Sequence, residues 1–207
     1  MKKGWLGLLS IGVVGTSAAA PTGLIVIPIA DILRHREFSV NHALTGTERS
    51  IDKRYYHIGG ATIGIADRAE VGVSTEYLGR HSWDAKVLVA EGQYKGLGYA
   101  ASVGAANGLG KSVDPYAVGR VDFNKFRIHG GAWRLNNVVQ GMIGADLELT
   151  DKWVLLADHI GGREGATWVA LSWDAGGGLS VMGAFGRPNT RSDGYQHQLV
   201  LTYTVRL

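Results

Sequence analysis

Charged side chains recur at every second position in several short segments of this chain. Successive side chains of an extended strand point to opposite sides, so this spacing places such groups on one shared face. The residues concerned are Glu70, Glu76, Arg120, Asp122, Arg127, His129, Asp146, Glu148, Asp158 and Arg206. Acidic and basic groups that line one interior could guide small polar solutes, or they could pair and fill the space.

Other kinds of chemistry have little support in the sequence. The chain has no cysteine, and its seven histidines lack a short ligand spacing such as His-x-x-x-His, so we expect no metal site. No Gly-x-Ser-x-Gly motif occurs, and the adjacent His81 and Ser82 would point to opposite faces of a strand. Ala105 stands where a phosphate-binding loop through Lys111 would need its first glycine. We therefore expect no catalytic residue, no cofactor and no enzyme activity.

Alternation of apolar and polar residues marks most of the chain after residue 36. In the last segment, Leu201, Tyr203 and Val205 share one face, whereas Thr202 and Thr204 share the other. An even number of strands is typical of single-chain outer-membrane barrels, in which it returns both chain ends to one side. The alternation predicts twelve strands: 37–44, 55–65, 69–78, 84–90, 96–104, 115–123, 126–134, 141–149, 152–159, 166–173, 178–185 and 196–207.

The connections between the expected strands are of two kinds. Every second one is short, as at 66–68, 91–95 and 124–125, and most of the others are longer, as at 45–54 and 105–114. Short turns at one end and longer loops at the other are typical of outer-membrane barrels, whose short turns face the periplasm. The sequence thus predicts an all-β fold, a transmembrane antiparallel up-and-down β-barrel of about twelve strands.

The two faces of the expected strands differ in charge. Most charged residues fall on one parity, and the other parity carries aliphatic, aromatic and small residues such as Val73, Leu147 and Leu201. A charge that faces lipid at mid-membrane costs about 2–4 kcal/mol, so we expect the apolar parity to face lipid. Four exceptions fall at strand ends, where headgroups or water can solvate them: Glu91, Arg134, His57 and His159.

Tryptophan and tyrosine lie mostly near the ends of the expected strands. Amphipathic rings suit the two membrane–water interfaces, so we expect these residues to form aromatic girdles. The residues are Tyr55, Tyr56, Tyr77, Trp83, Tyr116, Trp133, Trp153, Trp168, Trp173 and Tyr195.

The chain begins with the features of a secretory signal peptide. Lys2 and Lys3 precede an apolar stretch and a run of small residues, and we expect the peptide to span residues 1–19. Residues 20–36 have no clear period, and we expect an N-terminal segment in the periplasm or inserted into the lumen. The outer-membrane barrel would then comprise residues 37–207. Loss of Lys2 and Lys3 would lower the formal net charge from +3 to +1, so we expect no nucleic-acid partner.

The chain after the signal peptide resembles Gram-negative outer-membrane β-barrel proteins of the porin-like kind. Its last nine residues, LVLTYTVRL, look like the terminal-strand signal read by the barrel assembly machinery, although they end in Leu207 rather than an aromatic residue. Residues 21–30 (PTGLIVIPIA) and 65–73 (IADRAEVGV) are loosely similar to a barrel family linked to exopolysaccharide secretion. The resemblance implies an outer-membrane location, with membrane lipids and the barrel assembly machinery as partners.

Three functions are compatible with these features, and we favour the first. A narrow porin-like or export-associated channel for small polar solutes would use the charged face as its lining. A closed structural or assembly barrel would instead hold paired charges in a filled interior. A secreted lipocalin-like barrel would bind an apolar ligand inside, which requires the opposite facing of the two parities.

Small residues on the charged face favour a passage or crevice over a solid plug. They would leave space along one wall of the lumen, against which we expect the N-terminal segment to lie. These residues are Gly60, Gly64, Gly72, Gly96, Gly98 and Gly104.

Overall fold

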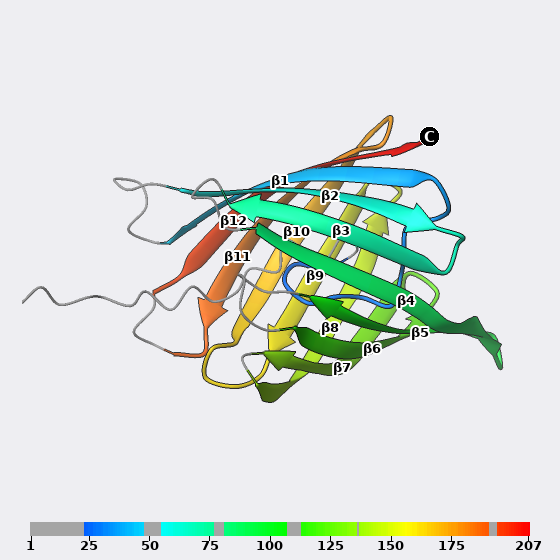
Figure 1. Cartoon of the computed structure of the whole chain (residues 1–207), viewed down its shortest axis with the longest axis horizontal. Helices are drawn as coiled ribbons and strands as arrows, with labels where there is room; N and C mark the ends of the chain where they lie inside the picture. Colours follow the sequence, from blue (N-terminus) through cyan, green and yellow to red (C-terminus); the bar gives the residue numbers. More distant parts are fainter. Residues whose placement is uncertain (1–22, 48–54, 77–80, 107–112, 136, 191–193) are drawn as a thin grey trace, which may run out of the picture.

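Residues 23–47, 55–76, 81–106, 113–135, 137–190 and 194–207 are described by the computed structural model. Within them, antiparallel strands form one closed barrel, in which each strand pairs with its chain neighbours and the first strand also pairs with the last (Figure 1). The predicted fold class and strand number are therefore confirmed. The strands are β1 (Glu37–Thr47), β2 (Tyr56–Ile65), β3 (Ala69–Glu76), β4 (His81–Tyr94), β5 (Leu97–Ala106), β6 (Asp114–Phe123), β7 (Phe126–Leu135), β8 (Val138–Thr150), β9 (Trp153–Ile160), β10 (Ala166–Gly176), β11 (Leu179–Pro188) and β12 (Gln196–Arg206).

Several strands are longer than their alternation predicts. The expected turn at 91–95 is wrong, because β4 continues to Tyr94 and the chain reverses at Lys95 and Gly96. These two residues have φ values of 50° and 82°, and a two-residue turn with positive φ at both positions matches the twist of the flanking strands. Apolar alternation fades where a strand leaves the membrane, so it underestimates the length of such strands.

Tight turns gather at the end of the barrel where β1 begins and β12 ends. They lie at 66–68 between β2 and β3, at 95–96 between β4 and β5, at 124–125 between β6 and β7, at 151–152 between β8 and β9, and at 177–178 between β10 and β11. Most connections at the opposite end are longer. Short turns mark the periplasmic side of an outer-membrane barrel, so we call this end the periplasmic end and the opposite one the outer end.

The outward-facing side chains of the strands are apolar. Val73, Ile143 and Val169 are 61%, 58% and 51% exposed. The two residues that flank each of them along the strand are buried. The inward positions include buried carboxylates such as Asp146 and Asp158. This facing is the reverse of what a soluble barrel with an apolar ligand needs, so the lipocalin-like alternative is wrong.

The aromatic girdle is found in part. Trp153 and Trp173 lie in register near the periplasmic end of β9 and β10, exposed and stacked with ring centroids 6.1 Å apart. In contrast, Tyr116, Trp133 and Trp168 are buried, so their assignment to a lipid-facing girdle is wrong. They take inward positions because large rings fill the interior near the outer end. Tyr77 and the expected signal peptide lie outside the described residues, and no helix among the described residues is long and apolar enough to span a membrane.

Candidate functional site

Residues 23–36, which we call the N-terminal segment, cross the interior of the barrel before the chain enters β1. Figure 1 shows this segment as a blue trace between the walls. A tight turn opens it, in which the Leu24 N–H donates to the Ile27 carbonyl at 3.0 Å. Residues 24–30 are all buried. The segment thus occupies the space that a solute would have to cross.

One carboxylate on β9 holds the turn of the N-terminal segment. Asp158 Oδ2 accepts hydrogen bonds from the backbone N–H groups of Ile25 and Val26 at 2.9 Å and of Ile27 at 3.3 Å. A carboxylate that accepts several backbone N–H bonds forms a strong, directional contact, because an ionised acceptor strengthens each bond. The turn provides three donors at one point, and the inward position of Asp158 provides the matching acceptor.

A buried ion pair on β3 and β4 holds the middle of the segment. Glu70 and Lys86 lie in register, and the Lys86 ammonium is 2.7 Å from Glu70 Oε1. The second carboxylate oxygen accepts the Leu33 N–H at 2.8 Å, and the ammonium donates to the Ile29 carbonyl at 3.1 Å. Each charged group therefore pairs with the other and also hydrogen-bonds to the backbone of the segment. Buried charges need both a counter-charge and further hydrogen bonds to offset their desolvation.

One further hydrogen bond places this part of the segment against β5. Ser102 Oγ donates to the Ala30 carbonyl at 2.6 Å. Asp84 lies beside Lys86 on the inward face of β4 and is buried, and its carboxylate oxygens accept no hydrogen bond from a described residue. The wall thus holds the segment through side chains of β3, β4 and β5 together.

Two arginines near the periplasmic end bind the acidic residue of the segment. Asp31 forms ion pairs with Arg120 and with Arg127, the second at 3.5 Å. The Arg120 guanidinium also lies 2.7 Å from Asp122. The two arginines come from β6 and β7, which are joined by the tight turn at 124–125, so the fold brings both within reach of Asp31.

The same network continues from β7 to β8. Arg127 Nε lies 2.8 Å from Asp146 Oδ1, and His129 Nε2 lies 2.8 Å from Asp146 Oδ2. His129 and Asp146 are buried. Asp146 therefore holds a basic group on each of its oxygens, and opposite charges face one another across neighbouring strands.

Glycines give the segment room. A Cβ on Gly64 would collide with the carbonyls of Leu33 and Arg34, and a Cβ on Gly144 would collide with the side chains of Leu24 and Ile27. A side chain at Gly64 would push the backbone of the segment off the wall, whereas one at Gly144 would displace only the ends of two flexible side chains. Gly64 belongs to the glycines expected along the wall, whereas the sequence analysis did not single out Gly144.

The space over two other expected glycines is filled by side chains. A Cβ on Gly98 would collide with the Asp122 carboxylate, and one on Gly104 would collide with the Tyr116 ring. The expectation of open space at these two glycines is therefore wrong. Neighbouring large side chains lean over small residues, because protein interiors close-pack.

The structure brings most of the predicted site residues into this interior network, but not all of them. Glu70, Arg120, Asp122, Arg127, His129, Asp146 and Asp158 take part in it through the contacts given above. Glu76 is half-buried near the outer end of β3, and Glu148 and Arg206 are exposed near the periplasmic ends of their strands.

Three residues of the network were absent from the predicted site. Lys86 and Ser102 fall on the inward parity of their strands, so the alternation itself could have found them. Asp31 lies in a segment without a period, so nothing in the sequence marked it. Among the described residues, no group of three or more histidine, aspartate or glutamate side chains is placed to hold a metal ion.

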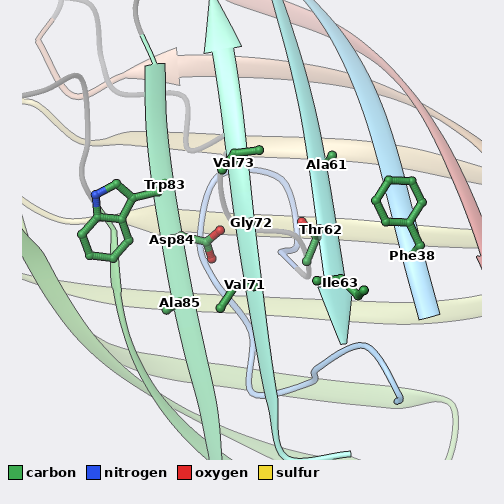
Figure 2. Close-up of a pocket in the computed structure, with 10 residues that line it drawn as sticks. All are labelled: Phe38, Ala61, Thr62, Ile63, Val71, Gly72, Val73, Trp83, Asp84 and Ala85. Atoms are coloured by element: carbon green, nitrogen blue, oxygen red, sulfur yellow. The ribbon is translucent and has the colours of Figure 1, made fainter. Parts of the chain in front are cut away.

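A pocket of about 410 Å³ opens on the lipid-facing side of β1 to β4, outside the interior network. Figure 2 shows Phe38 and Trp83 at its two sides, with Val71 and Val73 between them. Ala61 and Ala85, whose side chains are small, line the pocket together with the backbone of Gly72. This lining is almost wholly apolar, as a surface that meets lipid requires.

Comparisons with known proteins identify the architecture. No family model matches the chain, and no curated protein matches its sequence. Among solved structures, the KdgM porin has a TM-score of 0.61 at 10% identity, covering 81% of this chain and 99% of the porin.

Two further solved structures are similar in the same way. The outer membrane protein Omp33 of Acinetobacter baumannii has a TM-score of 0.52 at 13% identity, covering 83% of this chain and 98% of that protein. Outer membrane phospholipase A of Escherichia coli has a TM-score of 0.50 at 8% identity, covering 93% and 97%. The chain therefore has the fold of outer-membrane β-barrels, which porins and an enzyme share, and its outer surface is apolar as contact with lipid requires.

Proposed function

We propose that this outer-membrane barrel is a narrow, porin-like channel for small polar solutes, and that the N-terminal segment controls its opening. The observation that carries the proposal is the way the segment is held. Its backbone is bound by Asp158, Glu70, Lys86 and Ser102, and these contacts are hydrogen bonds that water can replace. The segment is not one of the strands of the barrel, so its release from the interior leaves the strand pairing intact.

The charges of the wall support a role in conduction. Arg120 and Asp122 lie on β6, Arg127 on β7 and Asp146 on β8, so basic and acidic groups alternate along this part of the wall. Opposed rings or rows of charge orient polar solutes and set ion preference in narrow pores. Displacement of Asp31 would leave both arginines facing the passage.

A closed structural barrel is the second candidate, and one observation favours it. Leu24, Ile27 and Ile29 pack in one cluster of buried apolar residues with wall residues such as Leu156 and Trp168. Burial of apolar surface stabilises such a contact by about 25 cal/mol per Å², so this packing opposes release of the segment. The two candidates differ in whether the segment moves under native conditions.

Single-channel recording in planar bilayers separates the candidates. We expect brief openings from the wild-type barrel and a higher open probability from Asp158→Asn, because the amide carries no charge to hold the three N–H groups. Glu148→Gln is the matched control, since this exposed carboxylate lies outside the network. If wild type and Asp158→Asn both stay silent while heat-modifiable migration on a gel confirms folding, the closed barrel is the correct account.

The proposal carries no enzymatic step. Phospholipase A shares the fold at 8% identity, which is evidence of architecture only. We propose that the chain is not an enzyme. Absence of acyl-ester hydrolysis by the folded barrel in mixed micelles of phospholipid and detergent tests this part separately.

A further inference from the structure

Three polar side chains stand side by side on the lipid-facing surface near the outer end. Thr167 of β10 lies in register with His159 of β9 on one side and with Arg187 of β11 on the other. His159 Nδ1 lies 2.9 Å from Thr167 Oγ1. The neighbouring outward positions on β10 and β11 carry Val169 and Phe185, which are both exposed. The polar trio is thus a local interruption of an apolar surface.

Arg187 is the member of the trio that carries a permanent positive charge. Its side chain is exposed at the second-last position of β11. Among the described residues, no carboxylate forms an ion pair with it. A cation on the lipid face is tolerated near the interface, where anionic headgroups lie within its reach. A guanidinium presents up to five N–H donors in a geometry that matches phosphate oxygens.

Thr167 can add a donor beside the guanidinium. When the His159 Nδ1–H donates to Thr167 Oγ1, the hydroxyl hydrogen is left to donate to a further acceptor. A phosphate group between Arg187 and Thr167 would then receive hydrogen bonds from both. Protonated His159 would add a second positive charge next to it.

The surface below the trio fits an acyl chain. Gly183 faces outward on β11, in register with Leu171 on β10 and Leu199 on β12. A Cβ on Gly183 would have no atom within 4 Å, whereas both leucines are exposed. The two leucines therefore flank an open space over Gly183, which we call the groove, on the periplasmic side of Arg187 and Phe185. The charged groups lie near the membrane surface and the apolar groove lies deeper in the bilayer. A membrane lipid places its charged headgroup and its acyl chains in the same order.

The connection between β9 and β10 is fixed against the end of β11. Asn189 Nδ2 donates to the carbonyls of Ile160 at 3.0 Å and Gly162 at 2.7 Å. Thr190 Oγ1 donates to the Arg163 carbonyl at 2.7 Å. These bonds tie together the strand ends that carry His159, Thr167 and Arg187, so the polar trio is held in place before a ligand binds. Preorganisation lowers the entropic cost of binding.

We propose that Arg187, Thr167 and His159 form a binding site for the phosphate group of a membrane lipid, with an acyl chain of that lipid in the groove over Gly183. The site lies on the outer surface of the barrel and does not depend on whether the barrel conducts. Its ligand is a lipid rather than free phosphate, because the groove continues the charged site toward the middle of the membrane.

The test uses the full barrel folded in a neutral detergent and lipid A as the phosphorylated lipid, with bound lipid counted by native mass spectrometry. Arg187→Gln should weaken lipid A binding about tenfold, as expected when charge-assisted hydrogen bonds to phosphate are lost. Arg134→Gln is the matched control. Arg134 is also exposed near the outer end, on β7, but it donates to Asn137 and lies in register with Val139. It should change binding less than twofold.

A second variant tests the groove without touching the charges. Gly183→Val should weaken lipid A binding by filling the groove, and the open space at this position leaves folding unaffected. Gly130→Val on β7 is its control, since a Cβ there meets only the Met142 carbonyl, at 3.8 Å. Inorganic phosphate should not displace lipid A at equal concentration.

Three results would overturn the proposal. Equal losses from Arg187→Gln and Arg134→Gln would indicate general attraction to positive charge. Unchanged binding by Gly183→Val would remove the acyl groove from the site. Displacement of lipid A by an equal concentration of inorganic phosphate would indicate a site for free anions. Heat-modifiable migration of each variant confirms that the barrel compared is folded.

Discussion

Glu70 and Lys86 face one another across β3 and β4 with the carboxylate and ammonium 2.7 Å apart, and neither side chain is exposed to solvent. Each also binds the backbone of the N-terminal segment, at Leu33 and Ile29 respectively. The pair therefore contributes both to the stability of the barrel wall and to the placement of the N-terminal segment. Loss of one partner should affect both properties.

Removal of the ammonium should cost more stability than removal of a neighbouring carboxylate. Lys86→Met leaves Glu70 buried without its counter-charge, which typically costs about 3–5 kcal/mol. Asp84→Asn is the matched change on the same strand face, and because no described residue donates a hydrogen bond to Asp84, we expect less than about 1 kcal/mol. Urea unfolding in lipid vesicles measures both. Equal losses from the two variants would mean that the Glu70–Lys86 pair contributes nothing specific.

Release of the segment should be measurable by chemical labelling. The chain has no cysteine, so Ala30→Cys introduces a single thiol at a fully buried position of the segment. A water-soluble maleimide should react with it slowly, and about tenfold faster when Asp158→Asn is added, because the charged acceptor of three N–H groups is lost. Asp151→Cys, in an exposed turn, is the control for reagent quality. Identical labelling rates with and without Asp158→Asn would show that Asp158 does not hold the segment.

A glycine substitution offers an independent way to displace the segment. Gly64→Ala places a methyl group against the carbonyls of Leu33 and Arg34, so the segment has to move. Gly59→Ala on the same strand is the control, because its nearest neighbour would be the Asn41 carbonyl at 4.0 Å. Only Gly64→Ala should raise the labelling rate of Ala30→Cys. Equal effects of the two glycine variants would mean that the segment does not contact Gly64.

Strand residues of opposite parity should respond differently to a new charge. Leu201 is exposed on the outer face near the middle of β12, whereas Thr202 faces inward. Leu201→Arg should cost about 2–4 kcal/mol of folding free energy in bilayers, and Thr202→Arg less than half of that. Equal costs would contradict the assigned facing.

The sequence predicts those parts of the structure in which apolar and polar residues alternate. Strands such as β12 were predictable because each buries one side against lipid, and alternate residues record that constraint. Tyr116, Trp133 and Trp168 were assigned to the wrong face because an aromatic ring suits either an interface or a filled interior. Arg187 was placed in a loop, since the expected strand ended at residue 185, and its register with Thr167 was therefore not visible.

The contacts of the N-terminal segment lay beyond sequence reasoning. Asp158 and Ile25 are more than a hundred residues apart, and the segment has no periodic pattern to indicate a partner. Paired charges were foreseen as one way to fill the interior. The sequence did not indicate that the backbone of residues 24–33 would bind these charges, because backbone N–H donors have no signature in the sequence.

Selectivity should reveal the charges of the wall if ions pass. Neutralising Arg120 and Arg127 together removes the arginine partners of Asp122 and Asp146, leaving His129 alone beside Asp146, and should raise cation preference. Reversal potentials in a KCl gradient measure this preference. The control is Arg206→Gln, which removes an exposed charge near the end of β12 and should leave the reversal potential unchanged. An unchanged reversal potential in the double variant would remove the two arginines from the conducting path.

The central claim, that the N-terminal segment opens and closes the barrel, is tested most directly by a reversible tether. Leu24→Cys and Gly144→Cys place two thiols where the Leu24 side chain lies on Gly144, in a chain with no other cysteine. Disulfide formation requires Cβ atoms about 3.5–4.5 Å apart, which this close contact permits. In planar bilayers, we predict that the oxidised variant is silent and that a reducing agent restores openings like those of the wild type. Openings of equal frequency before and after reduction, with the disulfide confirmed by mass spectrometry, would contradict the claim.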